Sequence, residues 1–149
     1  MIDAQSSMVE ITHLEKRFGA EIAVEDFNLS VGKGEFVTLL GPSGCGKTTT
    51  LRSIAGLEKL DAGEIRIGQN IVVSADKNIF LDPEKREIGM VFQSYAVWPH
   101  MTVFDNVAYG LRVRGTKSSD LKKKTSYALE LVGLDHLAER FATKLSGGQ

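Results

Sequence analysis

The chain has 149 residues, of which 42% are hydrophobic and 25% are charged, a composition typical of a globular protein and sufficient for one domain. Its formal net charge of −1 gives no support to general nucleic-acid binding, so we expect no nucleic-acid partner. No apolar run approaches the ~20 residues of a membrane helix, and no signal pattern opens the chain, so we expect a cytoplasmic protein that can still dock on a membrane protein.

The first part of the chain predicts strands. Residues 1–7 are small and polar, which favours a frayed terminus. Alternating apolar side chains predict half-buried strands at 8–14 and 23–31, with residues 16–19 as the loop between them. Residues 36–40 are apolar, β-prone and uncharged, which predicts a strand buried on both faces of a parallel sheet.

A helix and more strands follow. Residues 48–55 carry apolar side chains at helical spacing. Two short strands are predicted at 64–68 and 70–73, and residues 74–86 are charged and loop-like. Residues 88–92 predict a second buried strand. A strand, helix, hairpin and strand in this order indicate a parallel α/β core with an antiparallel appendage.

Beyond residue 93 the pattern becomes helical. Residues 95–100 form an aromatic loop, and Thr102 opens a helix with a capping box. Ser119 is a candidate N-cap for a second helix, which Gly133 closes. A short helix is expected at 135–140.

Residues 41–48 read GPSGCGKT and match G-x-x-x-x-G-K-[ST], the phosphate-binding loop. A predicted strand precedes the motif and a predicted helix follows it, as the motif requires. Its glycines allow backbone N–H groups to converge on phosphate oxygens at a helix N-terminus. Lys47 supplies a charge for the β- and γ-phosphates, and the Thr48 hydroxyl is placed to bind Mg²⁺. The nucleotide contacts expected here are Gly41, Pro42, Ser43, Gly44, Cys45, Gly46, Lys47 and Thr48.

Cys45 is the only cysteine of the chain, which excludes an internal disulfide and a cysteine-rich zinc site. Its place inside the phosphate loop leaves two interpretations open. We favour a small residue that fits the loop. The alternative is an oxidation-sensitive thiol whose modification blocks nucleotide binding.

The last five residues, 145–149, read LSGGQ and are identical to the signature sequence of ATP-binding-cassette (ABC) ATPases. With the phosphate loop, Gln93 and this signature in order, the chain resembles that family from about Val9 onward. Residues 92–103 further resemble the importer subunits for sugars, polyamines and ferric iron. The resemblance implies an α/β P-loop NTPase core with a parallel sheet, an antiparallel β subdomain and a helical subdomain, the C-terminal part of the core being missing. Core and β subdomain would span about 8–93, and the helical subdomain about 94–149.

The same resemblance implies roles for single residues. Phe18 matches the aromatic residue that stacks on adenine, which suits a flat ring. Thr49 is expected near the α-phosphate. Gln93 matches the glutamine that reaches Mg²⁺ and the attacking water, so Lys47 and Gln93 are the expected catalytic residues, and Thr48 and Gln93 the metal ligands. The signature residues are expected to contact ATP held by a second subunit, although Ser146 also suits a plain helix N-cap; they are Ser146, Gly147, Gly148 and Gln149.

The implied function is ATP binding and hydrolysis in an importer. Two subunits, expected as a homodimer, would sandwich two MgATP head to tail. Tyr95 to Pro99 and Phe104 match the segment that grips the transmembrane permease subunits, and an extracytoplasmic solute-binding protein would act indirectly. The ATPase would lie on the cytoplasmic face of the membrane.

Three family residues have no match in residues 1–149: the magnesium-binding aspartate, the catalytic glutamate and the switch histidine, all of which follow the signature. We therefore expect this stretch alone to be inactive in hydrolysis, and its open strand edges to make it unstable or oligomeric. Other readings are a catalytically inactive nucleotide-binding module, which hydrolysis by the purified chain would exclude, and a soluble ABC ATPase of DNA repair or translation, against which residues 95–99 argue. A P-loop small-molecule kinase is least supported, because residues 145–149 have no role in it.

Overall fold

The computed structural model describes residues 7–149 and divides into two compact units, which meet in sequence between Val91 and Phe92. Of the terminus expected to fray, residues 1–6 lie outside the described part, while Ser7 already begins a strand. The assignment of the two parts as catalytic core and helical subdomain stays a prediction.

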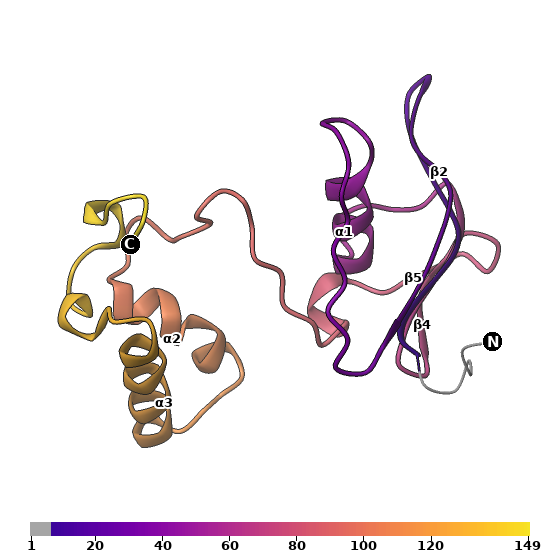
Figure 1. Cartoon of the computed structure of the whole chain (residues 1–149). Helices are drawn as coiled ribbons and strands as arrows, with labels where there is room; N and C mark the ends of the chain where they lie inside the picture. The colour runs from indigo at the N-terminus through magenta and orange to yellow at the C-terminus, as the bar shows by residue number, and fades with distance from the viewer. Residues whose placement is uncertain (1–6) are drawn as a thin grey trace. The chain divides into compact units, whose positions relative to one another are not determined.

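A five-stranded antiparallel sheet dominates the first unit (Figure 1). Its strand order is β2-β1-β3-β4-β5, so the first strand lies between the second and the third. The predicted hairpin is confirmed, with its turn at Gly68 and Gln69. The strands are β1 (Ser7–Phe18), β2 (Glu21–Gly32), β3 (Ala62–Ile67), β4 (Asn70–Ser74) and β5 (Ile79–Phe80).

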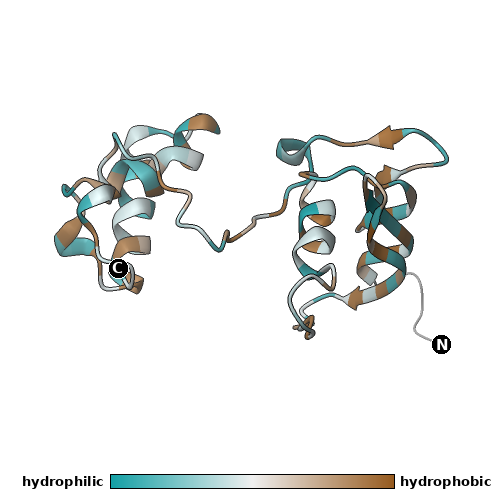
Figure 2. Ribbon diagram, turned by 90° about the horizontal axis from the view of Figure 1, so that it is seen from above, coloured by the Kyte–Doolittle hydropathy of each residue, from teal (hydrophilic) through white to brown (hydrophobic). Residues whose placement is uncertain are grey.

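The hydrophobic core lies on one face of this sheet. Apolar and polar residues alternate along the strands, visible as brown and teal bands in Figure 2. Leu14 and Ile65 are fully buried, and Ile54 of the neighbouring helix packs against the same cluster. Each fully buried aliphatic side chain stabilises the fold by roughly 1.5–3 kcal/mol. The buried core residues are Ile11, Leu14, Val24, Ile65, Ile67, Val72 and Val73.

The loop predicted at residues 16–19 is wrong in its extent. β1 continues through Lys16 and Arg17, which pair with Val24 and Ile22 of β2. The chain turns only at Gly19, whose φ of +61° suits glycine. The charged side chains concealed the strand, because Arg17 and the residues after it are exposed and need no apolar alternation.

Helix α1 (Lys47–Ala55) confirms the helix predicted after the phosphate loop and lies beside the sheet (Figure 1). Gly56 ends it in the left-handed conformation. The buried guanidinium of Arg86 contacts this end: its Nη1 donates to the carbonyls of Ser53 and Ile54 at 2.8 Å each. Its Nε donates to Leu81 O at 2.7 Å.

The two predicted parallel strands are absent. Residues 36–40 and 88–92 are irregular, and Phe36, Leu40 and Val91 are 93%, 95% and 97% exposed. Apolar, β-prone residues adopt a strand only where a neighbouring strand accepts their hydrogen bonds. No strand within residues 7–149 pairs with either segment.

The charged stretch predicted as a loop is mostly irregular but contains short regular elements. Strand β5 pairs with β4, and a 3-10 turn, η1 (Pro83–Lys85), follows it. Strand β5 was missed because two residues carry no periodic pattern.

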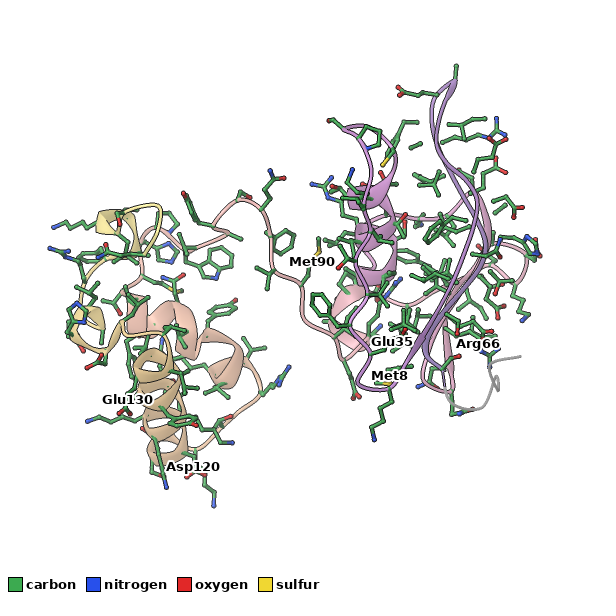
Figure 3. The ribbon with its side chains drawn as sticks, in the orientation of Figure 1. Met8, Glu35, Arg66, Met90, Asp120 and Glu130 are labelled. Carbon is green, nitrogen blue, oxygen red and sulfur yellow. The ribbon has the colours of Figure 1, made fainter. Side chains whose placement is uncertain are left out.

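The second unit is helical. Thr102 is the N-cap of α2 (Val103–Val113), as predicted, and its Oγ1 accepts from Asp105 N at 3.1 Å. Helix α3 (Ser118–Leu131) runs from Asp120 near its start to Glu130 near its end (Figure 3). Its N-cap is Lys117, so Ser119 lies inside the helix, and the prediction of a serine cap is wrong. The remaining short 3-10 turns are η2 (Asp135–Leu137) and η3 (Ala142–Lys144).

Gly133 follows α3 with a φ of +67°, as the sequence predicted. The helix expected at 135–140 is limited to the single turn η2. None of the helices in residues 7–149 is long and apolar enough to cross a membrane.

Candidate functional site: a phosphate-binding loop on a helix N-terminus

The phosphate loop ends in the N-terminus of α1. Gly46 is the N-cap with a φ of +85°, and Gly44 has the same φ. Both conformations are unfavourable for residues with a side chain. The first turn of α1 carries no acidic residue, so its free N–H groups and the helix dipole keep their positive potential. This arrangement suits an anion.

Close backbone contacts fix the loop against the sheet. A Cβ at Gly46 would lie 2.5 Å from the carbonyl oxygen of Ala23 and 2.7 Å from Val24 Cγ2, both on β2. A Cβ at Gly41 would lie 2.6 Å from Cys45 Sγ. The loop is therefore a cradle with room for glycine alone at Gly46, where the neighbour is backbone, whereas at Gly41 the neighbour is the end of the Cys45 side chain. A glycine loop on a helix N-terminus suits a phosphate group.

Lys47 spans the loop. Its Nζ donates to Gly41 O at 2.8 Å and to Pro42 O at 2.6 Å, and it lies 3.3 Å from Cys45 Sγ. No carboxylate forms an ion pair with it in the described part of the chain. The two carbonyls orient the ammonium while its charge stays available for phosphate oxygens.

Thr48 is exposed and lies beside this cradle, in the first turn of α1. Within residues 7–149 no three His, Cys, Asp or Glu side chains gather to hold a metal ion. Mg²⁺ is commonly held by one or two protein ligands together with substrate phosphates. The donor set here fits that mode, in which Thr48 would be a ligand, and does not fit a preformed metal cage.

Phe18 lies at the hairpin end that borders the phosphate loop. Val24, which contacts Gly46, pairs with Lys16 of β1, and Phe18 pairs with Glu21 at the end of the hairpin. The ring is 49% exposed. The aromatic ring and the residue that contacts the phosphate cradle, Val24, thus lie on the same hairpin, a few residues apart. This spacing suits a ligand that carries phosphates at one end and a flat base at the other.

Gln93 belongs to the second unit and is exposed in an irregular segment. Its expected roles toward Mg²⁺ and water stay predictions. Thr49, Ser43 and Pro42 lie in the first unit, as their positions in the motif require.

The signature residues form a compact turn in the second unit. Ser146 N donates to Gln149 Oε1 at 3.0 Å, and Gln149 N donates to Ser146 O at 2.9 Å. Gly147 lies directly against Tyr95, because a Cβ there would be 2.7 Å from the Tyr95 hydroxyl. Gly148 is exposed, with open space around its Cα. The turn presents Ser146 and backbone groups to solvent.

The aromatic loop that precedes α2 is exposed but anchored. Tyr95 is 74% exposed, and Trp98 packs against Tyr109 at 5.6 Å between ring centroids. Asn106 fixes this loop to the helix: its Oδ1 accepts from Trp98 N at 2.7 Å, and its Nδ2 donates to Trp98 O at 3.1 Å and to Thr102 O at 2.9 Å. Phe104 is half-buried.

Sequence reasoning missed several residues that support the site. Asn106 carried a weak signal in the sequence, since an asparagine side chain within a helix commonly forms hydrogen bonds with nearby backbone groups. Lys16 and Asp61 carried none, because they lie far apart in sequence and only the strand order brings them together. The contact of Tyr95 with Gly147 is equally remote in sequence.

Comparison with known proteins gives consistent results. The family model described as ABC transporter matches residues 24–149. The chain is 46% identical over 142 residues to the spermidine/putrescine import ATP-binding protein PotA of Haemophilus influenzae, covering 95% of this chain and 37% of the relative. It is 49% identical over 141 residues to the trehalose/maltose import ATP-binding protein MalK of Thermococcus litoralis, covering 95% and 38%.

A third relative is the Fe(3+) ions import ATP-binding protein FbpC of Agrobacterium fabrum, 46% identical over 149 residues, or 100% of this chain and 40% of the relative. The chain thus spans about two fifths of the curated relatives that it matches. Among solved structures, the dimeric post-hydrolysis state of the ATP-binding cassette MJ0796 bound to ADP and Pi matches with a TM-score of 0.81 and 32% identity, over 95% of this chain and 65% of that chain. This likeness confirms the predicted fold class, although residues 36–40 and 88–92 form no strands here.

Proposed function

The chain belongs to the ABC transporter family, and from that premise we propose that it is the ATP-binding part of an importer subunit. The intact protein would bind and hydrolyse MgATP in a head-to-tail dimer and so drive solute uptake through membrane partners. The relatives named above, all import ATP-binding proteins, support this proposal. The sequence of residues 92–103, which resembles that of importer subunits, also supports it.

One observation carries the ATP-binding step: the glycine cradle at the N-terminus of α1 with Lys47 across it. Backbone N–H groups and the ammonium bind the β- and γ-phosphates and offset the charge on the transferred phosphoryl group. Phe18 orients the nucleotide by stacking on its base. Thr48 and Gln93 would hold Mg²⁺, which supplies charge neutralisation between the phosphates when bound.

The second half of the ATP site would come from a second copy. Ser146, Gly147 and Gly148 are exposed, and we expect the Ser146 hydroxyl and the backbone N–H groups of the two glycines to bind a γ-phosphate. Gln149 braces this turn through its bond to Ser146 N. The dimeric state of the ATP-binding cassette named above supports a second copy as the partner.

The membrane partners would contact the aromatic loop. Tyr95 and Trp98 expose apolar surface next to α2, and such a patch marks an interaction site more often than a free surface. Phe104 is half-buried and would contribute less. We propose that residues 95–99 dock on transmembrane permease subunits at the cytoplasmic face of the membrane, with a solute-binding protein acting through them.

The test uses the full-length protein. ATP binding and hydrolysis are measured in the presence and absence of Mg²⁺ for the wild type, for Lys47→Ala and for Lys33→Ala, an exposed lysine in the preceding turn. We expect Lys47→Ala to lower hydrolysis at least 10²-fold, within the range typical of a lost phosphate-site donor, and Lys33→Ala to leave it unchanged. Hydrolysis that survives Lys47→Ala, or that needs no Mg²⁺, would contradict the proposal. Binding without hydrolysis in the wild type would favour the inactive nucleotide-binding module instead.

A further inference from the structure

Lys16 lies beneath the exposed aromatic ring at the hairpin end. Its Nζ is 5.1 Å from the centroid of the Phe18 ring, within the range of a cation–π contact. Although lysine side chains are usually exposed, this one is only 13% exposed. The stem is therefore packed along the strand, and the ammonium covers one side of the ring.

Asp61 holds the ammonium in this place. Its carboxylate lies 3.7 Å from Lys16 Nζ and accepts a 2.6 Å hydrogen bond from Arg17 N. Asp61 N donates to Glu15 O at 3.0 Å. The turn before β3 is thus tied to three consecutive residues of β1, directly before Phe18. The carboxylate can shift neither along nor away from the strand without losing one of these bonds.

We propose that Lys16 is a positioning residue for the base of the nucleotide, acting through Phe18. The inference rests on the proposed function, since it assigns Phe18 the base. The ammonium occupies one side of the ring and restricts its rotation, which leaves the half-exposed ring ready to stack on a purine with its free side. Asp61 completes the device by fixing the ammonium. Pre-ordering of the ring lowers the entropy that the base must offset on binding.

This role differs from a phosphate contact. The ammonium of Lys47 is held by carbonyls of the phosphate loop, whereas that of Lys16 is held by Asp61 and the ring. Lys16 should therefore contribute to the affinity for ligands that carry a base and should be indifferent to a bare phosphate chain.

The experiment compares two ligands on the full-length protein. Isothermal titration calorimetry with Mg²⁺ gives the Kd of ATP and of inorganic tripolyphosphate for the wild type, Lys16→Met, Lys16→Arg and Arg17→Met. Arg17→Met is the matched control, because it removes the same charge from the neighbouring residue. We expect Lys16→Met to raise the Kd of ATP two- to fivefold, the scale of a modest cation–π contact, and to leave the Kd of tripolyphosphate unchanged. Lys16→Arg should keep the wild-type affinity, and Arg17→Met should change neither ligand.

A double-mutant cycle shows whether the effect passes through the ring. In a Phe18→Ala background, Lys16→Met should change the Kd of ATP no further. Asp61→Asn, which keeps an acceptor for Arg17 N but loses the charge, should reproduce part of the Lys16→Met effect.

The outcomes separate the two proposals. Three results would overturn the role of Lys16 while leaving ATP binding intact. Lys16→Met could weaken the binding of ATP and tripolyphosphate equally, it could leave the affinity for ATP unchanged, or its effect could persist in the absence of Phe18. A wild-type protein that binds neither ligand would overturn the proposed function itself.

Discussion

At Gly46 the phosphate loop lies against β2 so closely that a Cβ would meet the Ala23 carbonyl oxygen and the Val24 side chain. Gly44, two residues earlier, shares the φ of +85° but has open space where a side chain would lie. Comparison of Gly44 with Gly46 distinguishes two reasons why a position requires glycine: its backbone conformation and the lack of space for a side chain. Conformation requires one at both positions, whereas contact with β2 requires one only at Gly46.

Alanine substitutions should therefore differ at these two positions. Gly44→Ala should cost about 1–2 kcal/mol for its left-handed backbone and leave the loop in place. Gly46→Ala should lower the free energy of unfolding further and should raise the Kd of ATP more than tenfold, because its Cβ would displace the loop from Ala23. Urea denaturation and ATP titration of the full-length protein check both. Equal effects of the two substitutions would contradict the contact with the sheet.

At the scale of elements, Arg86 connects the far end of α1 to the segment after β5. It is only 3% exposed and donates to three backbone carbonyls, at Leu81, Ser53 and Ile54. Burial lowers the pKa of its guanidinium from the ordinary value, and an arginine side chain carries its charge at neutral pH. The cation also complements the negative end of the helix dipole.

Arg86→Met should destabilise the protein by at least about 2 kcal/mol, because the carbonyls of Ile54 and Leu81 lose the donor that Arg86 supplies. Lys85→Met is the control: this neighbour is exposed, and its ion pair with Asp82 lies at the surface. The free energy of unfolding in urea is the measurement. A similar loss for the two variants would show that Arg86 is not a structural cap of α1.

Helix α2 carries a pH-dependent N-terminus. Hydrogen bonds from Arg112 and from the Thr102 hydroxyl, in that order, hold the pKa of Asp105 below its ordinary value of 3.8. Because the folded pKa is the lower one, ionised Asp105 stabilises the helix above pH 3.8, and this contribution is lost as the pH falls through the folded value.

Arg112→Gln should therefore raise the pKa of Asp105 toward 3.8. Carboxyl NMR shifts of labelled aspartate, recorded against pH, give the titration midpoint. Arg114→Gln, at the same end of the helix, should leave the midpoint where it is. A midpoint that Arg112→Gln does not move would show that the ion pair does not set this pKa.

The sequence predicted those features of the helices and the phosphate loop that depend only on neighbouring residues. Gly44, Gly46 and Lys47 could be placed because their chemistry is local, and Thr102 because a capping box spans four residues. The pairing of β1 with β3 could not, because the residues of β3 lie about fifty positions further along the chain and apolar alternation does not name a partner strand. The Lys16–Asp61 contact depends on that pairing, so it was beyond sequence reasoning.

At the scale of the whole molecule, two apolar segments were predicted to be buried strands, but whether such a segment forms a strand depends on a partner strand. Residues 36–40 and 88–92 have the composition of core strands, but a strand also needs a neighbour, and none pairs with them in the part of the chain that the structure describes. Phe36, Leu40 and Val91 therefore expose large apolar side chains. Such segments favour association.

The 149-residue polypeptide, expressed by itself, should therefore self-associate. Light scattering after gel filtration should give a mass well above 16.3 kDa. Combined Phe36→Ser and Leu40→Ser substitutions should lower that mass, whereas Val113→Ser, at an exposed position on α2, should not. A monomer with one cooperative unfolding transition would contradict this expectation.

The hydrogen bonds of the Asn106 side chain should make the aromatic loop and α2 move together as one rigid body. Two hydrogen bonds in opposite directions join the amide to the Trp98 backbone, and a third joins it to Thr102 at the start of the helix. A force applied to the loop is then transmitted to the helix axis rather than absorbed by bending of the connection. The Trp98 amide should accordingly exchange its hydrogen as slowly as the first turn of α2, and Asn106→Ala should uncouple the two.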